Sequence, residues 1–123
     1  MSSTYTQIYY HIVYSTKHRV PALVDEHRES LYRYLWGVLQ KKNCHLYRIG
    51  GTDDHIHVLS SVHPNVDLAG LIRDMKSAST SWIKTNGVFR GFPGWQDGYG
   101  AFTKSHTDKD TVIAYIKKQP EHH

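Results

Sequence analysis

The sequence lacks the residues that mark several large classes of protein. Its single cysteine, Cys44, excludes an internal disulfide framework and a zinc site of the CxxC kind, and it suits a cytoplasmic protein. No apolar run approaches the roughly 20 residues that a membrane helix needs. The opening residues MSSTYTQ lack the basic stretch followed by an apolar one that marks a secretion signal. We therefore expect a cytoplasmic protein with no membrane segment.

The residues that are present fit a single domain over residues 1–123. Of the 123 residues, 39% are hydrophobic and 21% are charged, which is enough for one core and leaves little room for a second. Lys and Arg number 15 against 11 Asp and Glu, and the net charge of +4 mildly favours a polyanionic partner. Ten histidines and nine tyrosines are many for so short a chain, and they indicate metal or phosphate chemistry, aromatic stacking, or both.

The hydrophobic periodicity predicts four strands and three helices. Strands are expected at residues 8–15, 44–49, 55–62 and 99–105. Helices are expected at 25–42, with Asp25 as its cap, at 67–85, and from Thr107 or Asp108 to about Gln119, before Pro120. This order predicts an α+β fold, the ferredoxin-like βαββαβ plait with an added C-terminal helix. Its antiparallel sheet would carry helices on one face and leave the other face open.

The tripeptide His55-Ile56-His57 is the most informative short motif. On a strand, positions i and i+2 point to the same face, so the two imidazoles point one way and Ile56 points toward the helices. This is the spacing of two metal ligands, although a working site also needs a third ligand and an adjacent nucleophile or water. A pair of surface histidines on a half-solvated strand explains the same spacing, so both interpretations remain.

Tyr115 and Gln119 lie four residues apart, on one flank of the last predicted helix. A tyrosine in such a position most often packs its ring and leaves its hydroxyl in water. Its phenol could instead attack phosphorus if a metal stabilised the developing charge, because its unperturbed pKa is about 10. Gln119 would then supply a neutral oxygen ligand beside the nucleophile. Tyr99 is a second candidate nucleophile, without a companion ligand at helical spacing.

Four motifs, in this order along the chain, resemble one family. They are residues 11–17 (HIVYSTK), His55-Ile56-His57 after Asp53-Asp54, residues 95–102 (WQDGYGAF) and residues 115–123 (YIKKQPEHH). Together they resemble the HUH-type single-tyrosine transposases of IS200/IS605-like bacterial insertion sequences, including the REP-associated tyrosine transposases. The resemblance covers essentially the whole chain.

The resemblance implies metal-dependent cleavage and rejoining of single-stranded DNA at element ends. It implies that Tyr115 attacks the DNA backbone and stays linked to the 5′ phosphate, and that the freed 3′ hydroxyl later attacks another phosphotyrosine junction. It assigns a divalent cation, Mg²⁺ or Mn²⁺, to His55, His57 and Gln119. The implied partners are single-stranded DNA with hairpin ends and a second copy of the chain, in a homodimer whose active sites are shared between subunits.

Other residues are candidate DNA contacts. These are Lys17 and Arg19 in a basic loop, Arg73 and Lys76 one turn apart on the long helix, and Trp95, which could stack on unpaired bases. Solvated charged surfaces explain the four cations equally well. Tyr99 and Phe102 could also stack on bases, but we expect Phe102 to pack in the core. His11 could face the same side as the metal site and support its ligands, but we expect ordinary surface exposure.

Two further functions remain open at the level of sequence. A non-catalytic domain that binds single-stranded nucleic acid would have a metal-independent affinity and no use for the three ligand candidates. A metal-dependent phosphodiester hydrolase would attack with metal-bound water, and its Tyr115→Phe variant would keep activity without forming a covalent adduct.

Overall fold

The sheet at the centre of the molecule has four antiparallel strands in the order β2-β3-β1-β4. The structure, a computed structural model, describes residues 8–119. The elements are β1 (Ile8–Ser15), α1 (Asp25–Lys41), β2 (His45–Gly51), β3 (His55–Val62), α2 (Leu68–Asn86), β4 (Gly100–Lys104) and α3 (Lys109–Lys117). The predicted α+β fold, with its order of strands and helices, is confirmed.

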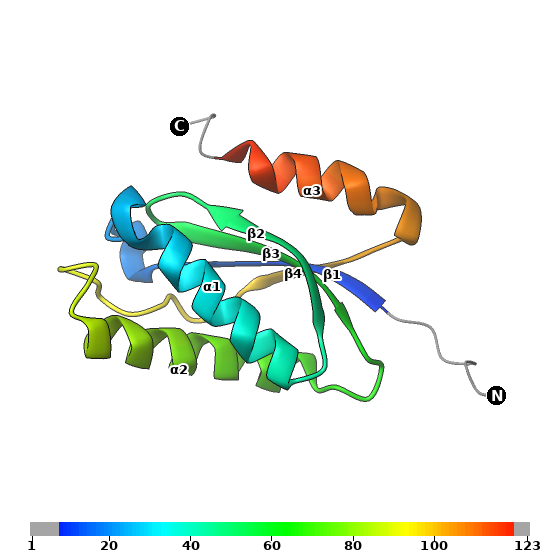
Figure 1. The fold of residues 1–123 in the computed structure, drawn as a ribbon, viewed down its shortest axis with the longest axis horizontal. Coiled ribbons are helices and arrows are strands. Elements are labelled where there is room, and N and C mark those ends of the chain that lie inside the picture. The colour runs from blue at the N-terminus through cyan, green and yellow to red at the C-terminus, as the bar shows by residue number, and fades with distance from the viewer. Residues whose placement is uncertain (1–7, 120–123) are drawn as a thin grey trace.

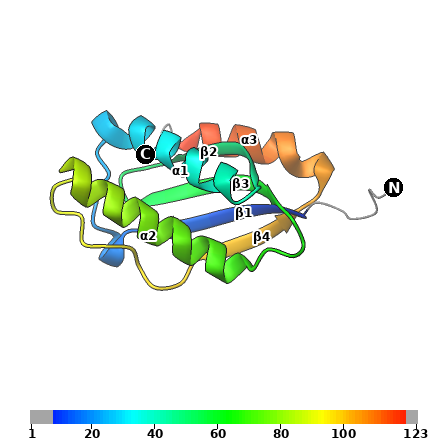
Figure 2. The same ribbon diagram turned by 60° about the horizontal axis from the view of Figure 1, so that its bottom comes forward.

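Helices α1 and α2 cover one face of the sheet and enclose the main core (Figures 1 and 2). Alternate residues of the central strands point into it, so Ile12 on β1 and Ile56 and Val58 on β3 are fully buried. Leu35 of α1 and Met75 of α2 meet them from the helices, at helical spacing. This burial fixes which residues of β1 and β3 point to the opposite face.

That opposite face is not open as expected, because α3 packs across it (Figure 1). Val112 and Ile116 of α3 form a second, smaller cluster with Leu59 of β3. Gly50 of β2 allows this approach: a Cβ there would lie 2.9 Å from Ile116 Cγ2 and 3.2 Å from the Ile116 carbonyl oxygen. The added helix therefore forms a third layer, and the histidine strand β3 lies beneath it.

Three local details differ from the expected element ends. Asp25 is the first residue of α1 rather than its cap, and no side chain caps this helix. Asp108 lies at the cap position of α3, as expected, but its side chain caps no N–H of that helix; its Oδ2 instead accepts from Ser105 Oγ at 2.8 Å. Gly51 belongs to β2, where a Cβ would collide with the carbonyl oxygen of His55. Helix α2 ends at Asn86, close to the expected end, and Gly87 follows it with a left-handed φ of 63°. Pro120 lies outside the described residues.

Within residues 8–119, no helix has the length and apolar character needed to cross a membrane.

Candidate active site

His55 and His57 lie side by side on β3, on the face that α3 covers. Their ring centroids are 4.9 Å apart, and their exposed fractions are only 8% and 5%. The predicted common face is therefore present. The alternative of two surface histidines on a half-solvated strand is wrong, because α3 and the neighbouring strands enclose both rings. Burying two imidazoles in this way requires polar partners for their nitrogens.

His55 is oriented by the turn that precedes it. Its Nδ1 lies 2.7 Å from Asp54 Oδ1 and 2.9 Å from Thr52 Oγ1, and Arg19 Nε pairs with the same carboxylate at 3.3 Å. Partial burial acts to raise the pKa of Asp54, but hydrogen bonds from His55 and Arg19 outweigh it and hold the pKa below its usual value. An ionised carboxylate accepts the Nδ1–H of His55, which leaves the ring lone pair on Nε2.

His57 is oriented by a third histidine on the adjacent strand. Its Nδ1 lies 2.9 Å from Nε2 of His11, which is buried and not the surface residue we expected. Burial first, then the neighbouring His55 and His11, lower the pKa of His57 to about 4, although the Gln119 amide acts in the opposite direction. His57 is therefore neutral near pH 7. Its Nε2 is buried without a hydrogen-bond partner among residues 8–119.

Helix α3 and the turn that follows it bring Tyr115 and Gln119 to the histidines. The Tyr115 ring stands edge-on to the His57 ring at 5.6 Å and to the His11 ring at 6.0 Å. Tyr115 is 50% exposed, whereas Gln119, one turn further along, is buried. Both side chains line an open pocket of about 740 Å³ together with His55 and His57. The four residues that the sequence singled out for chemistry thus share one pocket.

The pocket offers three protein atoms that could coordinate a divalent cation. No three His, Cys, Asp or Glu side chains in the described part of the chain are grouped to hold a metal. The available donors are therefore two imidazoles and the amide oxygen of Gln119. The buried Nε2 of His57 fits this use, because a metal bond would satisfy a lone pair that no hydrogen bond within residues 8–119 satisfies. Such a mixed nitrogen and oxygen set would also bind Zn²⁺ or Ni²⁺ in vitro.

The basic side chains that we expected to contact DNA lie in different surroundings. Arg19 lines the pocket while it pairs with Asp54, and Lys17 is exposed in the 3₁₀ turn Lys17–Arg19. Arg73 is exposed on α2, which covers the other face of the sheet from α3. Lys76 Nζ donates to the carbonyl oxygens of Gln96 and Gly98 at 2.9 and 2.6 Å, so it braces the loop beside the pocket.

The aromatic residues are arranged differently from our expectation. Trp95 packs edge-on against Tyr14 at 4.8 Å, and its Nε1–H donates to Ser79 Oγ at 2.9 Å. These contacts favour a structural role for Trp95 over base stacking. Phe102, expected in the core, is instead 54% exposed and lines the pocket with Tyr99. Besides Tyr115, the exposed rings at this site are therefore those of Tyr99 and Phe102.

Sequence reasoning preferred surface exposure for His11 over a supporting role, and it missed the role of the turn before His55. The alternation along β1 held a signal for His11. It is offset by one residue from Ile12, which is buried against α1 and α2, so it had to point to the other face. The signal for Thr52 and Asp54 was their position immediately before the histidine pair, but sequence alone does not show that the turn folds back onto His55.

A family model described as "Transposase IS200 like" matches residues 4–119. The chain belongs to the IS200-like transposase family. Among curated proteins, this transposase chain is similar to the ISDra2 transposase TnpA of Deinococcus radiodurans, with 23% identity over 118 residues that span 92% of this chain and 84% of that protein.

Solved structures of two relatives share the fold of this transposase chain. One is a crystal structure of a transposase-assigned protein from Deinococcus radiodurans R1, with a TM-score of 0.75, 21% identity and coverage of 98% of this chain and 96% of that one. The other is a REP-associated tyrosine transposase bound to a REP hairpin, with a TM-score of 0.72, 14% identity and coverage of 100% and 73%. At these identities the likeness demonstrates the common fold.

Proposed function

We propose that this IS200-like transposase cleaves and rejoins single-stranded DNA at element ends through a covalent 5′-phosphotyrosine intermediate on Tyr115. The observation that carries the proposal is the pocket that Tyr115 and Gln119 share with His55 and His57. The relative solved with a REP hairpin supports hairpin-bearing strands as the substrate class.

In the proposed step, the Tyr115 Oη attacks a backbone phosphorus. The new O–P bond forms as the bond from phosphorus to the 3′ oxygen breaks, and the 5′ phosphate remains on the tyrosine. The phenol gives its proton to water, since half of the side chain is exposed, and the 3′ oxygen leaves as a hydroxyl after gaining a proton. The reverse attack by a 3′ hydroxyl releases Tyr115 and rejoins the strand, so no external energy source is needed.

His55, His57 and Gln119 are the proposed ligands of a divalent cation, Mg²⁺ or Mn²⁺. When bound, the cation would supply electrostatic stabilisation of the charge that develops on the phosphoryl oxygens. The chain prepares its ligands beforehand: Asp54 holds the His55 ring through Nδ1, and His11 holds the His57 ring in the same way. The low pKa of His57 keeps its lone pair available at neutral pH. Arg19, at the rim, contributes positive charge toward the phosphate.

A denaturing gel for protein–DNA adducts tests the proposal. The protein would be incubated with Mg²⁺ or Mn²⁺ and a pool of hairpin-bearing single strands, labelled at the 3′ end so that the label lies on the cleaved 5′-phosphate fragment. We expect a labelled band that survives boiling, requires the metal and disappears in Tyr115→Phe. Tyr99→Phe is the matched control, because it removes the same hydroxyl from the other exposed tyrosine of the pocket. That variant should keep the adduct.

The alternative functions predict different cleavage products and adducts on the same gel. Cleavage without an adduct that persists in Tyr115→Phe would indicate a hydrolase that uses metal-bound water. Binding of the strands with no cleavage in any metal would favour a non-catalytic single-strand binder. An adduct that disappears in Tyr99→Phe instead would move the nucleophile to that residue.

The proposal includes a homodimer. Tyr115 and the histidine pair of its own chain already share the pocket, so exchange of tyrosines between subunits would require α3 to leave its present position. The contacts of one chain thus favour a site that is complete within that chain, whereas the family resemblance favours a shared one.

A further inference from the structure

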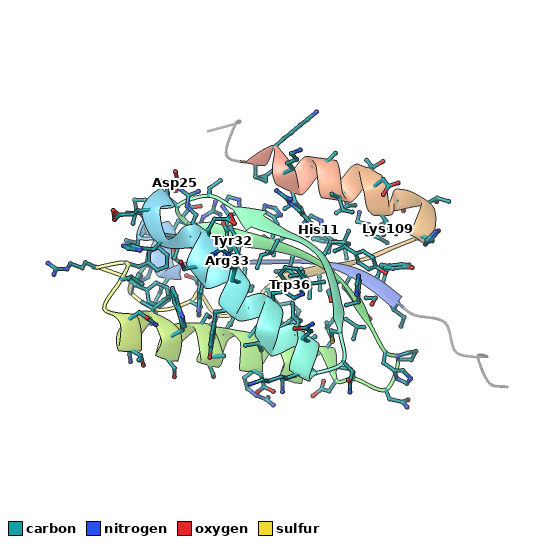
Figure 3. The ribbon with its side chains drawn as sticks, in the orientation of Figure 1. His11, Asp25, Tyr32, Arg33, Trp36 and Lys109 are labelled. Atoms are coloured by element: carbon teal, nitrogen blue, oxygen red, sulfur yellow. The ribbon has the colours of Figure 1, made fainter. Side chains whose placement is uncertain are left out.

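A second groove follows the edge strand β2, away from the active-site pocket. It has a volume of about 340 Å³ and lies between α1 and β2. Tyr32, Arg33 and Trp36 line it from α1, and Figure 3 shows these three along one side of that helix. Tyr47 and Arg48 line it from β2. None of these five residues lines the pocket that holds Tyr115.

The groove combines an exposed indole with two available guanidinium groups. Trp36 is 53% exposed, which is unusual for so large an apolar ring. Arg33 and Arg48 are both exposed, and among residues 8–119 neither takes part in a salt bridge. Glu29 lines the same groove, so the arginines outnumber the acids there. A ligand that offers both planar faces and negative charge would satisfy all three groups.

Single-stranded nucleic acid has this chemistry. An unpaired base can stack on an indole while the phosphates on either side contact arginines. Duplex DNA offers phosphates, but its bases are stacked inside the helix and cannot cover Trp36. An added peptide strand is disfavoured because the pairing of β2 with β3 shifts between Leu46 and Arg48, and an irregular edge is a poor template for another strand.

A smaller depression links this groove to the catalytic helix. It has a volume of about 130 Å³, shares Tyr32 and Arg48 with the groove, and reaches Ile116 and Lys117 of α3. Lys117 comes two residues after Tyr115. The depression also contains Glu29 and Asp25, which pairs with Arg28. A strand that passes over this end of α3 would therefore meet more basic than acidic groups on its path from the groove toward the pocket.

We propose that the groove between α1 and β2 binds an unpaired segment of the DNA strand, with a base stacked on Trp36 and its phosphates at Arg33 and Arg48. The proposal rests on the proposed function only in taking single-stranded DNA as the substrate. It adds a binding site that is separate from the proposed metal ligands and from Tyr115.

The test measures binding without catalysis. The affinity of the whole protein for a fluorescein-labelled oligothymidylate would be followed by fluorescence anisotropy in EDTA, over a series of salt concentrations. We expect Trp36→Leu to weaken binding by roughly 5- to 150-fold, the range that corresponds to the loss of one base–aromatic stack. Trp36→Phe should recover part of the affinity. Arg33→Gln and Arg48→Gln should each lower the slope of log K against log salt by about 0.7.

Two controls connect the effect to the groove. Arg90→Gln makes the same change of charge at an exposed arginine in the loop after α2, and its salt slope should equal that of the wild type. The oligonucleotide should quench tryptophan fluorescence in the wild type, and this quenching should be largely lost in Trp36→Leu. Circular dichroism would confirm that each variant is folded.

The remaining outcomes overturn the proposal. It fails if Trp36→Leu binds as tightly as the wild type, or if the wild type has no measurable affinity in EDTA. It also fails if duplex DNA binds equally well and loses affinity only in the arginine variants, or if Trp36→Leu changes the sedimentation coefficient and not DNA binding. The proposed function is tested separately by the adduct gel with Tyr115→Phe and Tyr99→Phe, so a failure of the groove and a failure of the tyrosine chemistry are distinguished by different experiments.

Discussion

His57 illustrates how much of this site depends on single residues outside the HUH motif. Its ring is fixed on one side by His11, and its other nitrogen is buried without a partner in the described chain. If the Nδ1–H of His57 donates to His11, the lone pair of His57 is on Nε2, where a metal could be bound. The hydrogen bond from a neighbouring strand therefore determines which atom of His57 is the ligand.

Replacement of His11 should thus weaken metal binding without removing a ligand. We expect His11→Phe to lower the affinity for Mn²⁺ by about 10- to 100-fold, the usual effect of losing the group that orients a ligand. His11→Gln should retain more of the affinity, because its amide oxygen can still accept from Nδ1–H. Calorimetric titration with Mn²⁺ measures both. Equal affinities for His11→Phe and the wild type would contradict this role.

The low pKa of His57 should also make stability depend on pH. Its pKa is about 4 in the folded chain, against about 6.5 for an unperturbed imidazole, so the unfolded chain binds more protons between these values. Stability should therefore fall as the pH is lowered, by about 2 kcal/mol from this group between pH 7.5 and 5. Urea unfolding in EDTA at both pH values would measure the loss. His57→Asn should reduce it, and an identical loss in the variant would rule out His57 as its source.

At the scale of elements, the contact between β2 and α3 determines where Tyr115 lies. Gly50 leaves room for the backbone of Ile116, and any side chain at this position would press against a carbonyl oxygen that cannot easily move. Only Val112 and Ile116 of α3 are buried, so the helix has a small apolar surface with which to resist displacement.

Gly50→Ala should therefore move or loosen α3. We expect a loss of about 1 to 3 kcal/mol in the free energy of unfolding, as for other overpacked sites, together with a larger fall in adduct formation. Gly37→Ala is the matched control: nothing lies within 4 Å of a Cβ there, and in mid-helix the change should be neutral or stabilising by up to about 1 kcal/mol. Urea unfolding and the adduct gel measure the two effects. Normal adduct formation by Gly50→Ala would show that α3 tolerates the displacement.

The elements themselves followed from local patterns, whereas their packing did not. Alternation in β1 and the apolar stripe of α2 are local properties, and the predicted β3 matches its observed bounds, His55–Val62. The side of the sheet on which α3 packs depends on long-range contacts, such as that between Gly50 and Ile116. Residues whose role depends on that choice were therefore mispredicted, as with buried His11 and exposed Phe102. Tyr115 and Gln119 were grouped correctly because helical spacing alone relates them.

At the scale of the whole molecule, the question is whether one chain holds a complete site. Tyr115→Phe and His57→Ala each remove one half of the proposed machinery, and a mixture of the two variants tests exchange between chains. Because α3 packs on its own chain, we expect the mixture to form no more adduct than the separate variants. Recovery of the adduct would instead support the shared active sites of a homodimer. Sedimentation of the wild type with and without DNA would give its oligomeric state.

The hydrogen bonds from Lys76 to the loop affect the electrostatic potential at the entrance of the pocket. The carbonyl oxygens of Gln96 and Gly98 belong to pocket-lining residues, and bare carbonyl dipoles would repel an incoming phosphate. The ammonium of Lys76 on α2 donates to both oxygens, and its positive charge would offset that repulsion. Under the proposed function, α2 would thus favour the approach of a polyanion to a pocket that its own residues do not line.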